Sequence, residues 1–318
     1  MRYYADQENL HTRIYAMRSR LLSLKDYNAI VRDQENLGEN ISEAHDYFKA
    51  KETVFREQIT MVISLAEATR KYAPLFIAFL RQYEANNVKL LLSKTFGRQT
   101  AEQWYDIGPY AILDRTLIDK GLSLNEIKTI IAGTYLEAIF NDISSYERLE
   151  IQTAISCVRN LYAASEPFLP ESRKVFRDVM LRRVSVIMMI WLWRLKQNYH
   201  WDDRRAKTYL DTIYNLNLFE GNGATEIKSL ERELTRHLEQ PGKAGDKTLT
   251  PTTIEYSLES YYYGWISSMF HKDFHSISCV VAYLFLLSYQ IRNMLCIIDG
   301  QRFGLSPERI LERIIGEG

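Results

Sequence analysis

The chain has few of the residues that build loops and turns. Its 318 residues include 14 glycines and 7 prolines, and both types are below their average usage. This composition argues against long irregular loops and against an all-β architecture. No segment alternates between apolar and polar residues with period two, so we expect no strand. The sequence therefore predicts an all-α fold.

Cysteine is also scarce. The three cysteines, Cys157, Cys279 and Cys296, lie far apart in the chain. An odd count without CxxC spacing excludes a disulfide framework and a zinc knuckle. We expect three buried thiols that behave as small apolar side chains in a reducing compartment.

The chain has no excess of either charge, since 40 Lys and Arg balance 40 Asp and Glu. Nothing therefore favours a nucleic-acid partner. The first residues, "MRYYADQENLHTR", are polar, so we expect no signal peptide. Two apolar runs, 184–195 and 276–291, are shorter than the roughly 20 residues that cross a membrane. We interpret them as core helices and expect no direct membrane span.

Motifs for nucleotide binding and hydrolysis are absent: there is no GxxxxGK[ST], GxSxG or HExxH. The most enzyme-like stretch is "HKDFH", in which His271 and His275 have the spacing of one helix face with Asp273 between them. A metal would need further ligands from elsewhere, and surface or capping histidines are more common. We therefore predict no catalytic residue, no cofactor and no metal.

Apolar residues recur at helical spacing through most of the chain. Several start signals divide it: Ser123 with Glu126 and Thr100 with Gln103 form capping boxes, and Thr250 and Ser306 each precede a proline. The expected helices cover 6–33, 42–72, 74–95, 123–141, 145–164, 173–199, 202–215, 251–270, 276–299 and a short segment from 306.

Two segments about two hundred residues apart share a pattern. "NVKLLLSKTFGRQTAEQ" begins at Asn87 and "NMLCIIDGQRFGLSPER" begins at Asn293. Each passes through a glycine and reaches a hydroxyl residue, Thr100 or Ser306, where a new helix should begin. Residues 188–205 form a degraded third copy without the Asn and the Gly. Three copies predict three similar lobes, which can close around a pseudo-threefold axis as a funnel. The alternative is that any amphipathic helix-turn-helix has this spacing. The lobe boundaries predicted from this pattern are 1–110, 111–217 and 218–318.

The segment "NLHTRIYAMRSRLLS", with Arg13, resembles the opening signature of the C subunits of archaeal- and vacuolar-type rotary ATPases, whose eukaryotic counterparts are the d subunits. Residues 86–103, with Asn87 and Lys89, are similar to the first-lobe motif of that family. Residues 290–315, with Asn293 and Ser306, are similar to its C-terminal motif. The segment 188–205 falls at the expected place but lacks the usual Asn.

The resemblance implies a non-catalytic funnel of three helical lobes. It implies that the chain sits peripherally on the cytoplasmic end of the membrane proteolipid ring and receives the tip of the central rotor shaft. Such a socket couples ATP hydrolysis or synthesis to the transport of protons or sodium. The expected partners are the shaft subunits, the ring and the rest of the complex.

Two stretches are candidates for contact with a partner. The basic segment 173–196 includes Arg182 and Arg183, which either form a solvated face or meet an acidic shaft tip. In "YYYGWISSMF", Tyr262 and Trp265 share a helix face that is either core or an aromatic grip. Gly264 in this helix costs roughly 1 kcal/mol and can admit another helix at close range.

Two other functions remain open at this stage. A helical-repeat adaptor for soluble proteins would be an elongated solenoid that does not fractionate with membranes. A metal-dependent helical hydrolase built on His271 and His275 would contain bound metal and an acidic pocket.

Overall fold

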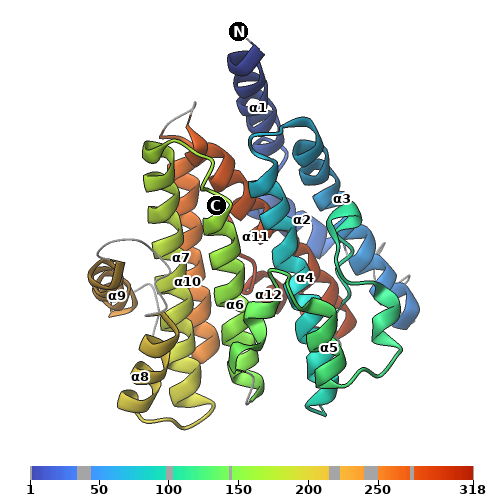
Figure 1. Ribbon diagram of the computed structural model, residues 1–318, viewed down its shortest axis with the longest axis vertical. Helices are drawn as coiled ribbons and strands as arrows, with labels where there is room; N and C mark the ends of the chain where they lie inside the picture. Colours follow the sequence, from blue (N-terminus) through green and yellow to red (C-terminus); the bar gives the residue numbers. More distant parts are fainter. Residues whose placement is uncertain are drawn as a thin grey trace. The chain divides into compact units, whose positions relative to one another are not determined.

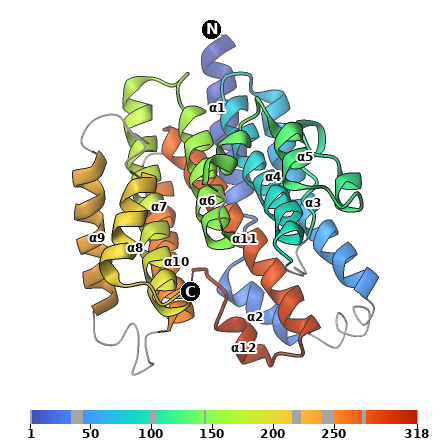
Figure 2. The same cartoon turned by 60° about the horizontal axis from the view of Figure 1, so that its bottom comes forward.

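A computed structural model describes residues 2–33, 44–97, 103–142, 145–214, 223–239, 250–272 and 276–317 (Figures 1 and 2). These residues form only α-helices and short 3-10 helices, so the predicted all-α fold is confirmed for them. The chain divides into two compact units. Unit 1 comprises residues 1–167 and 286–314, and unit 2 comprises residues 168–285 and 315–317.

Unit 1 is built around one long helix, α4, which packs against α3, α5 and α6. Its main core is apolar and includes Val88, Leu92, Ile131 and Leu149, each with no exposed surface. A second cluster joins α2, α11 and α12. The elements of unit 1 are α1 (Arg2–Arg18), α2 (Leu24–Arg32), α3 (Ala44–Ala68), α4 (Ala73–Thr95), η1 (Gly108–Tyr110), η2 (Arg115–Ile118), α5 (Leu124–Ile131), η3 (Glu137–Asp142), α6 (Tyr146–Ala163), the second half of α11 (Ile277–Arg302) and α12 (Pro307–Leu311).

Unit 2 is organised by α7, which packs against α8, α9 and α10. This helix is apolar around much of its circumference: Val179, Met180 and Val186 have no exposed surface. Such a helix is expected at the centre of a bundle. The elements of unit 2 are α7 (Pro170–Gln197), α8 (Asp203–Tyr214), α9 (Gly223–Glu239), α10 (Pro251–Phe270) and the first half of α11.

Local start signals account for several helix boundaries. Ser123 and Glu126 form the predicted capping box of α5, and Thr250 caps α10 ahead of Pro251. Ser306 likewise caps α12. Asp202 caps α8, because its Oδ1 accepts from the amide of Arg205 at 2.8 Å.

Three helix predictions were wrong, and α9 was not predicted. The helix expected over 123–141 ends at Ile131, and residues 137–142 form a 3-10 helix instead. The expected single helix over 6–33 is two helices, because Ser23 and Asp26 form a capping box that starts α2 after a turn. Thr100 lies outside the described residues, but the helix expected to begin there does not cover residues 103–107, which are not helical. In this segment Trp104 and Ile107 are buried instead, and Gly108 and Pro109 form a 3-10 turn.

One helix among the described residues, α11, is long and apolar enough to cross a membrane. However, 72% of its most apolar window is buried inside the protein, which is how core helices are packed. All three cysteines remain thiols: Cys279 is buried, and Cys157 and Cys296 are half-buried. The division into three lobes at 1–110, 111–217 and 218–318, arranged as a funnel, remains a prediction.

Candidate functional site

Arg182 and Arg183 on α7 are both engaged in ion pairs within unit 2. The Nη1 of Arg182 lies 2.9 Å from Oε1 of Glu233 on α9 and also donates to the hydroxyl of Tyr261. The Nη1 of Arg183 lies 2.6 Å from Oε2 of Glu259 on α10. The two arginine side chains are 15% and 24% exposed, so they are not part of a solvated basic face.

The same pairing recurs along α7. Arg177 lies 2.8 Å from Glu226 of α9, and Arg194 lies 2.5 Å from Glu255 of α10. Partly exposed ion pairs each contribute little net stability, whereas the Arg183 pair, whose Glu259 is 5% exposed, would leave an unpaired buried charge if one member were removed. These four arginines connect α7 to α9 and α10.

The two aromatic candidates meet these arginines. The guanidinium of Arg182 lies 4.6 Å from the ring centroid of Trp265, and that of Arg183 lies 5.3 Å from Tyr262. The two rings stack with centroids 6.2 Å apart. Tyr262 is fully buried and also packs edge-on against Phe285, whereas Trp265 is partly exposed. The structure therefore brings all four predicted residues together, as two stacked rings with one arginine beside each ring.

Hydrogen bonds shift the pKa values of Glu233 and Tyr261, which lie beside Arg182. Burial acts to raise the pKa of Glu233, but hydrogen bonds from Tyr261 and Arg182 outweigh it and hold that pKa below its ordinary value. Burial and the hydrogen bond to Glu233 raise the pKa of Tyr261 to about 12. At neutral pH the cluster therefore contains a carboxylate, a neutral phenol that donates to it, and a cation.

Two family-motif residues lie on α4. Asn87 is buried and binds both backbone groups of Tyr105: its Nδ2 donates to the carbonyl and its Oδ1 accepts from the amide, each at 2.8 Å. Lys89 lies 3.6 Å from Glu150 of α6. The motif residues on α4 therefore connect it to its neighbours within unit 1.

The other motif residues lie on α1, α11 and at the start of α12. The hydroxyl of Ser306 accepts from the amide of Arg309 at 3.4 Å and so starts α12. Asn293 is buried on α11, and Arg13 is half-buried on α1.

Glu84 is a key residue that the motifs did not single out. Its carboxylate has no exposed surface and accepts from the amides of Ile112 and Leu113 and from the hydroxyl of Tyr135 at 2.6 Å. Burial, followed by the charge of Glu84, raises the pKa of Tyr135, so this phenol remains a donor. The sequence gives no signal for it, because Glu84 stands in a polar part of α4 together with Arg81, Gln82 and Asn86.

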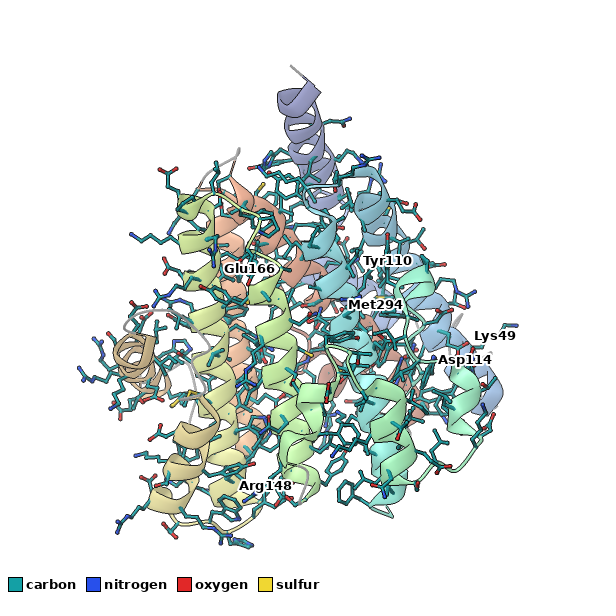
Figure 3. The ribbon with its side chains drawn as sticks, in the orientation of Figure 1. Lys49, Tyr110, Asp114, Arg148, Glu166 and Met294 are labelled. Atoms are coloured by element: carbon teal, nitrogen blue, oxygen red, sulfur yellow. The ribbon has the colours of Figure 1, made fainter. Side chains whose placement is uncertain are left out.

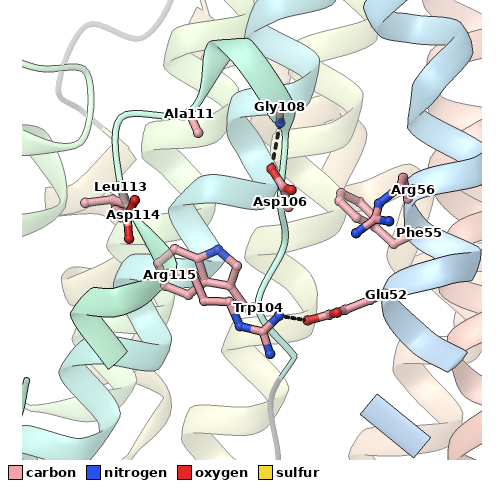
Figure 4. A pocket seen from close by; sticks show the side chains of 10 residues that line it. All are labelled: Glu52, Phe55, Arg56, Trp104, Asp106, Gly108, Ala111, Leu113, Asp114 and Arg115. Carbon is pink, nitrogen blue, oxygen red and sulfur yellow. Dashed lines mark hydrogen bonds and ion pairs between the residues drawn. The ribbon is translucent and has the colours of Figure 1, made fainter. Parts of the chain in front are cut away.

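A pocket of about 300 Å³ lies between α3 and the segment that follows α4 (Figure 4). Figure 3 shows Tyr110 and Asp114 along this segment. Two carboxylates that line the pocket already have partners. Glu52 pairs with Arg115 at 2.5 Å, and Asp106 accepts from the amide of Gly108 at 2.9 Å. A hydrogen bond from the Thr116 hydroxyl lowers the pKa of Asp114. These contacts order the loop.

The helix expected to carry the His271 stretch ends just before it. Helix α10 ends at Phe270, and His271 is its exposed C-cap. Asp273 and His275 lie outside the described residues. Within the described parts of the chain, no group of three His, Cys, Asp or Glu side chains could hold a metal ion. That His271 and His275 bind no metal remains a prediction.

Comparison with known proteins places the chain in a family. No curated protein sequence matches it. A family model described as "ATP synthase (C/AC39) subunit" matches residues 10–313, which is nearly the whole chain. The match includes Arg13, Asn87, Lys89, Asn293 and Ser306, the positions on which the resemblance was based. The chain therefore belongs to the ATP synthase (C/AC39) subunit family, the V/A-type ATPase subunits that its motifs resemble.

Proposed function

We propose that the chain is a non-catalytic central-rotor subunit, a socket between the rotor shaft and the membrane proteolipid ring. The observation that carries this proposal is the family match over residues 10–313. Through this socket, ATP hydrolysis or synthesis is coupled to the transport of protons or sodium. The protein acts peripherally, on the cytoplasmic face of the membrane.

Internal rigidity supports this role, because a part that transmits torque must resist deformation. In unit 2 the arginines of α7 hold two neighbouring helices through four ion pairs. In unit 1 the buried groups Asn87 and Glu84 fix the irregular segment after α4 by bonding to its backbone. Close packing and satisfied buried polar groups both favour a single stiff conformation.

We also propose that the surface around Arg182 and Trp265 contacts a partner. Tyr262 is fully buried, and Arg183 pairs with the buried Glu259. Tyr262 and Arg183 therefore lie beneath this surface and do not themselves contact the partner. Trp265 is partly exposed and lies under the Arg182 guanidinium. Partly exposed tryptophan and arginine are typical of interface anchors.

The test of the proposed function is recovery of tagged protein from native membranes in mild detergent, followed by mass identification of the chains that co-purify. We expect the ATPase head, the shaft and the proteolipid. Recovery of soluble proteins alone, with no shaft and no proteolipid, would refute the socket role and favour the adaptor.

The partner surface is tested separately with Trp265→Ala. We expect weaker recovery of the shaft subunits than with Tyr256→Ala, which removes a 39% exposed aromatic ring from the same helix. Equal recovery with the two variants would show that the Trp265 surface is not the contact.

A further inference from the structure

A pocket of about 420 Å³ opens in unit 1 among α3, α4 and α11, and its wall continues onto the segment after α12. Figure 2 shows α11 and α12 together with α2. We call this cavity the Lys51 pocket and define it by Lys51, Tyr83, Arg292, Asp299, Phe303 and Arg313. None of these residues was singled out by the sequence motifs.

The lining of the Lys51 pocket is cationic. Three basic side chains, Lys51, Arg292 and Arg313, face one carboxylate, Asp299, among the residues that line it. Burial raises the pKa of the Cys296 thiol in the same wall, while Arg313 and Arg292 act in the opposite direction. Both guanidinium groups are therefore close to this wall.

The single carboxylate is already occupied by groups of the protein. Its Oδ1 lies 2.8 Å from Nζ of Lys51, which is 7% exposed, and accepts from the hydroxyl of Tyr47 at 2.6 Å. Asp299 thus balances the buried lysine. Arg313, which is exposed, adds further positive charge to the lining.

A buried hydroxyl in the wall also lacks an acceptor. Tyr83 is 8% exposed, and its hydroxyl has no hydrogen-bond partner in the described part of the chain. The ring itself is held edge-on against Phe55, with centroids 4.9 Å apart. Buried polar groups normally find a partner, so a donor left unmet beside a cationic cavity points to an anionic ligand.

The rim carries an exposed aromatic ring. Phe303 follows α11 and is 70% exposed, more than any other large apolar side chain in the described ranges. Exposed aromatic rings beside polar pockets are typical anchors of protein interfaces.

We propose that the Lys51 pocket receives an Asp or Glu side chain from a loop of a neighbouring ATPase subunit, with Phe303 packed against that loop. The inference rests on the proposed function, which supplies the partner complex. The carboxylate pairs with Arg313 and accepts from Tyr83. Charge complementarity selects the partner residue, and Phe303 supplies the apolar contact.

A protein carboxylate fits the pocket better than an anionic membrane surface. Two of its polar groups, Lys51 and Tyr83, are each more than nine-tenths buried, so a ligand must enter the cavity to reach them. A membrane surface favours clustered exposed lysines and arginines instead. A cavity of about 420 Å³ has room for a carboxylate side chain on a loop.

The experiment uses the assembled complex. Tagged chains carrying Arg313→Glu, Tyr83→Phe or Phe303→Ser are expressed in place of the wild type, and the complex is recovered from membranes at physiological salt. The matched control is Arg309→Glu, an exposed arginine of α12 that does not line the pocket. Circular dichroism and the melting temperature verify that each variant folds.

We expect Arg313→Glu to lower recovery of ATPase subunits by about tenfold or more relative to Arg309→Glu. Tyr83→Phe should weaken recovery without lowering the melting temperature, because its hydroxyl has no partner in the described part of the chain. A photo-reactive benzoylphenylalanine in place of Phe303 should cross-link to an acidic loop of one subunit. Reversing that acidic residue to Lys should restore recovery with Arg313→Glu.

Equal recovery with Arg313→Glu and Arg309→Glu would overturn the inference while leaving the proposed function intact. Cross-linking to lipid alone, with binding of the free protein to phosphatidylglycerol vesicles that Arg313→Glu abolishes, would also overturn it in favour of a membrane headgroup. If the wild type recovers no ATPase subunit, the proposed function fails and the inference fails with it.

Discussion

Asn87 of α4 binds the backbone of Tyr105 through both of its side-chain atoms, at 2.8 Å each. The amide of an asparagine matches a peptide group in this way, donating with its nitrogen and accepting with its oxygen. The two bonds hold the backbone of Tyr105 in place beside α4. They also place the Tyr105 ring edge-on against Phe55, at 4.9 Å between centroids.

Replacing this asparagine should destabilise unit 1. Asn87→Ala leaves the part-buried amide and carbonyl of Tyr105 without partners and should lower the free energy of unfolding by about 2 kcal/mol. Urea denaturation followed by circular dichroism measures the change. Asn86→Ala is the control, since that side chain makes one bond of 3.3 Å to the Gln82 carbonyl. If both variants lose the same stability, the Asn87 bridge has no special role.

Replacing Glu84 should lower the free energy of unfolding more than replacing Asn87. Glu84→Ala removes the acceptor of three donors, two of which are backbone amides. We expect a loss of about 3 kcal/mol, whereas Tyr135→Phe removes only one donor and should cost about 1 kcal/mol. Denaturant melts of both variants and of the double variant measure the coupling. Losses of equal size for the two single variants would contradict the role of Glu84 as the shared acceptor of three donors.

The predictable parts of this fold are those set by neighbours in the sequence. Ser123 and Glu126 are three residues apart and cap α5 as expected, because both hydrogen bonds form within one turn. Ser23 and Asp26 obey the same rule and could have been recognised, which would have divided the first helix correctly. The partners of Asn87 lie eighteen residues away, so its role required the folded chain.

The candidate site shows the same limit. Spacing placed Tyr262 and Trp265 on one face of a helix, and the structure stacks their rings. No local rule pairs Arg182 with Glu233, which is fifty-one residues away, or Arg183 with Glu259. A run of basic residues was therefore interpreted as a solvated or partner-binding face, although four of its arginines are paired inside unit 2.

The Glu233 carboxylate should make the stability of unit 2 depend on acid pH. Its pKa is lowered in the folded protein, so the folded state binds fewer protons than the unfolded state. The stabilisation is complete above the ordinary value of 4.5 and is lost as the pH falls through the lowered folded pKa. Because the side chain is 43% exposed, the effect should be about 1 kcal/mol or less.

The measurement compares thermal melts of the wild type and Glu233→Gln between neutral pH and pH values below 4.5. The difference in melting temperature between them should shrink as the pH falls. Glu308→Gln, an exposed glutamate on α12, provides the baseline. A difference that stays constant with pH would show that Glu233 does not titrate in this way.

Two helical glycines should respond to alanine with opposite signs. A Cβ added to Gly300 of α11 would lie 2.6 Å from Cγ1 of Ile310 on α12, far inside a normal contact distance. Gly300→Ala should therefore cost about 1–3 kcal/mol, because α12 must shift away from the core it shares with α2. Gly264 of α10 is exposed, and a Cβ there meets nothing within 4 Å among the described atoms. It does not admit a neighbouring helix, and Gly264→Ala should stabilise the protein by about 0.5–1 kcal/mol.

Denaturant melts of the two single variants measure the signs. The cause of the first effect is tested with Ile310→Ala, which removes the side chain that the new methyl group would strike. The double variant should lose clearly less stability than the sum of the two single losses, because the clash is then absent. Additive losses would mean that Gly300 is needed for a reason other than its approach to Ile310. A destabilising Gly264→Ala would mean that α10 is packed more tightly at that point than the structure shows.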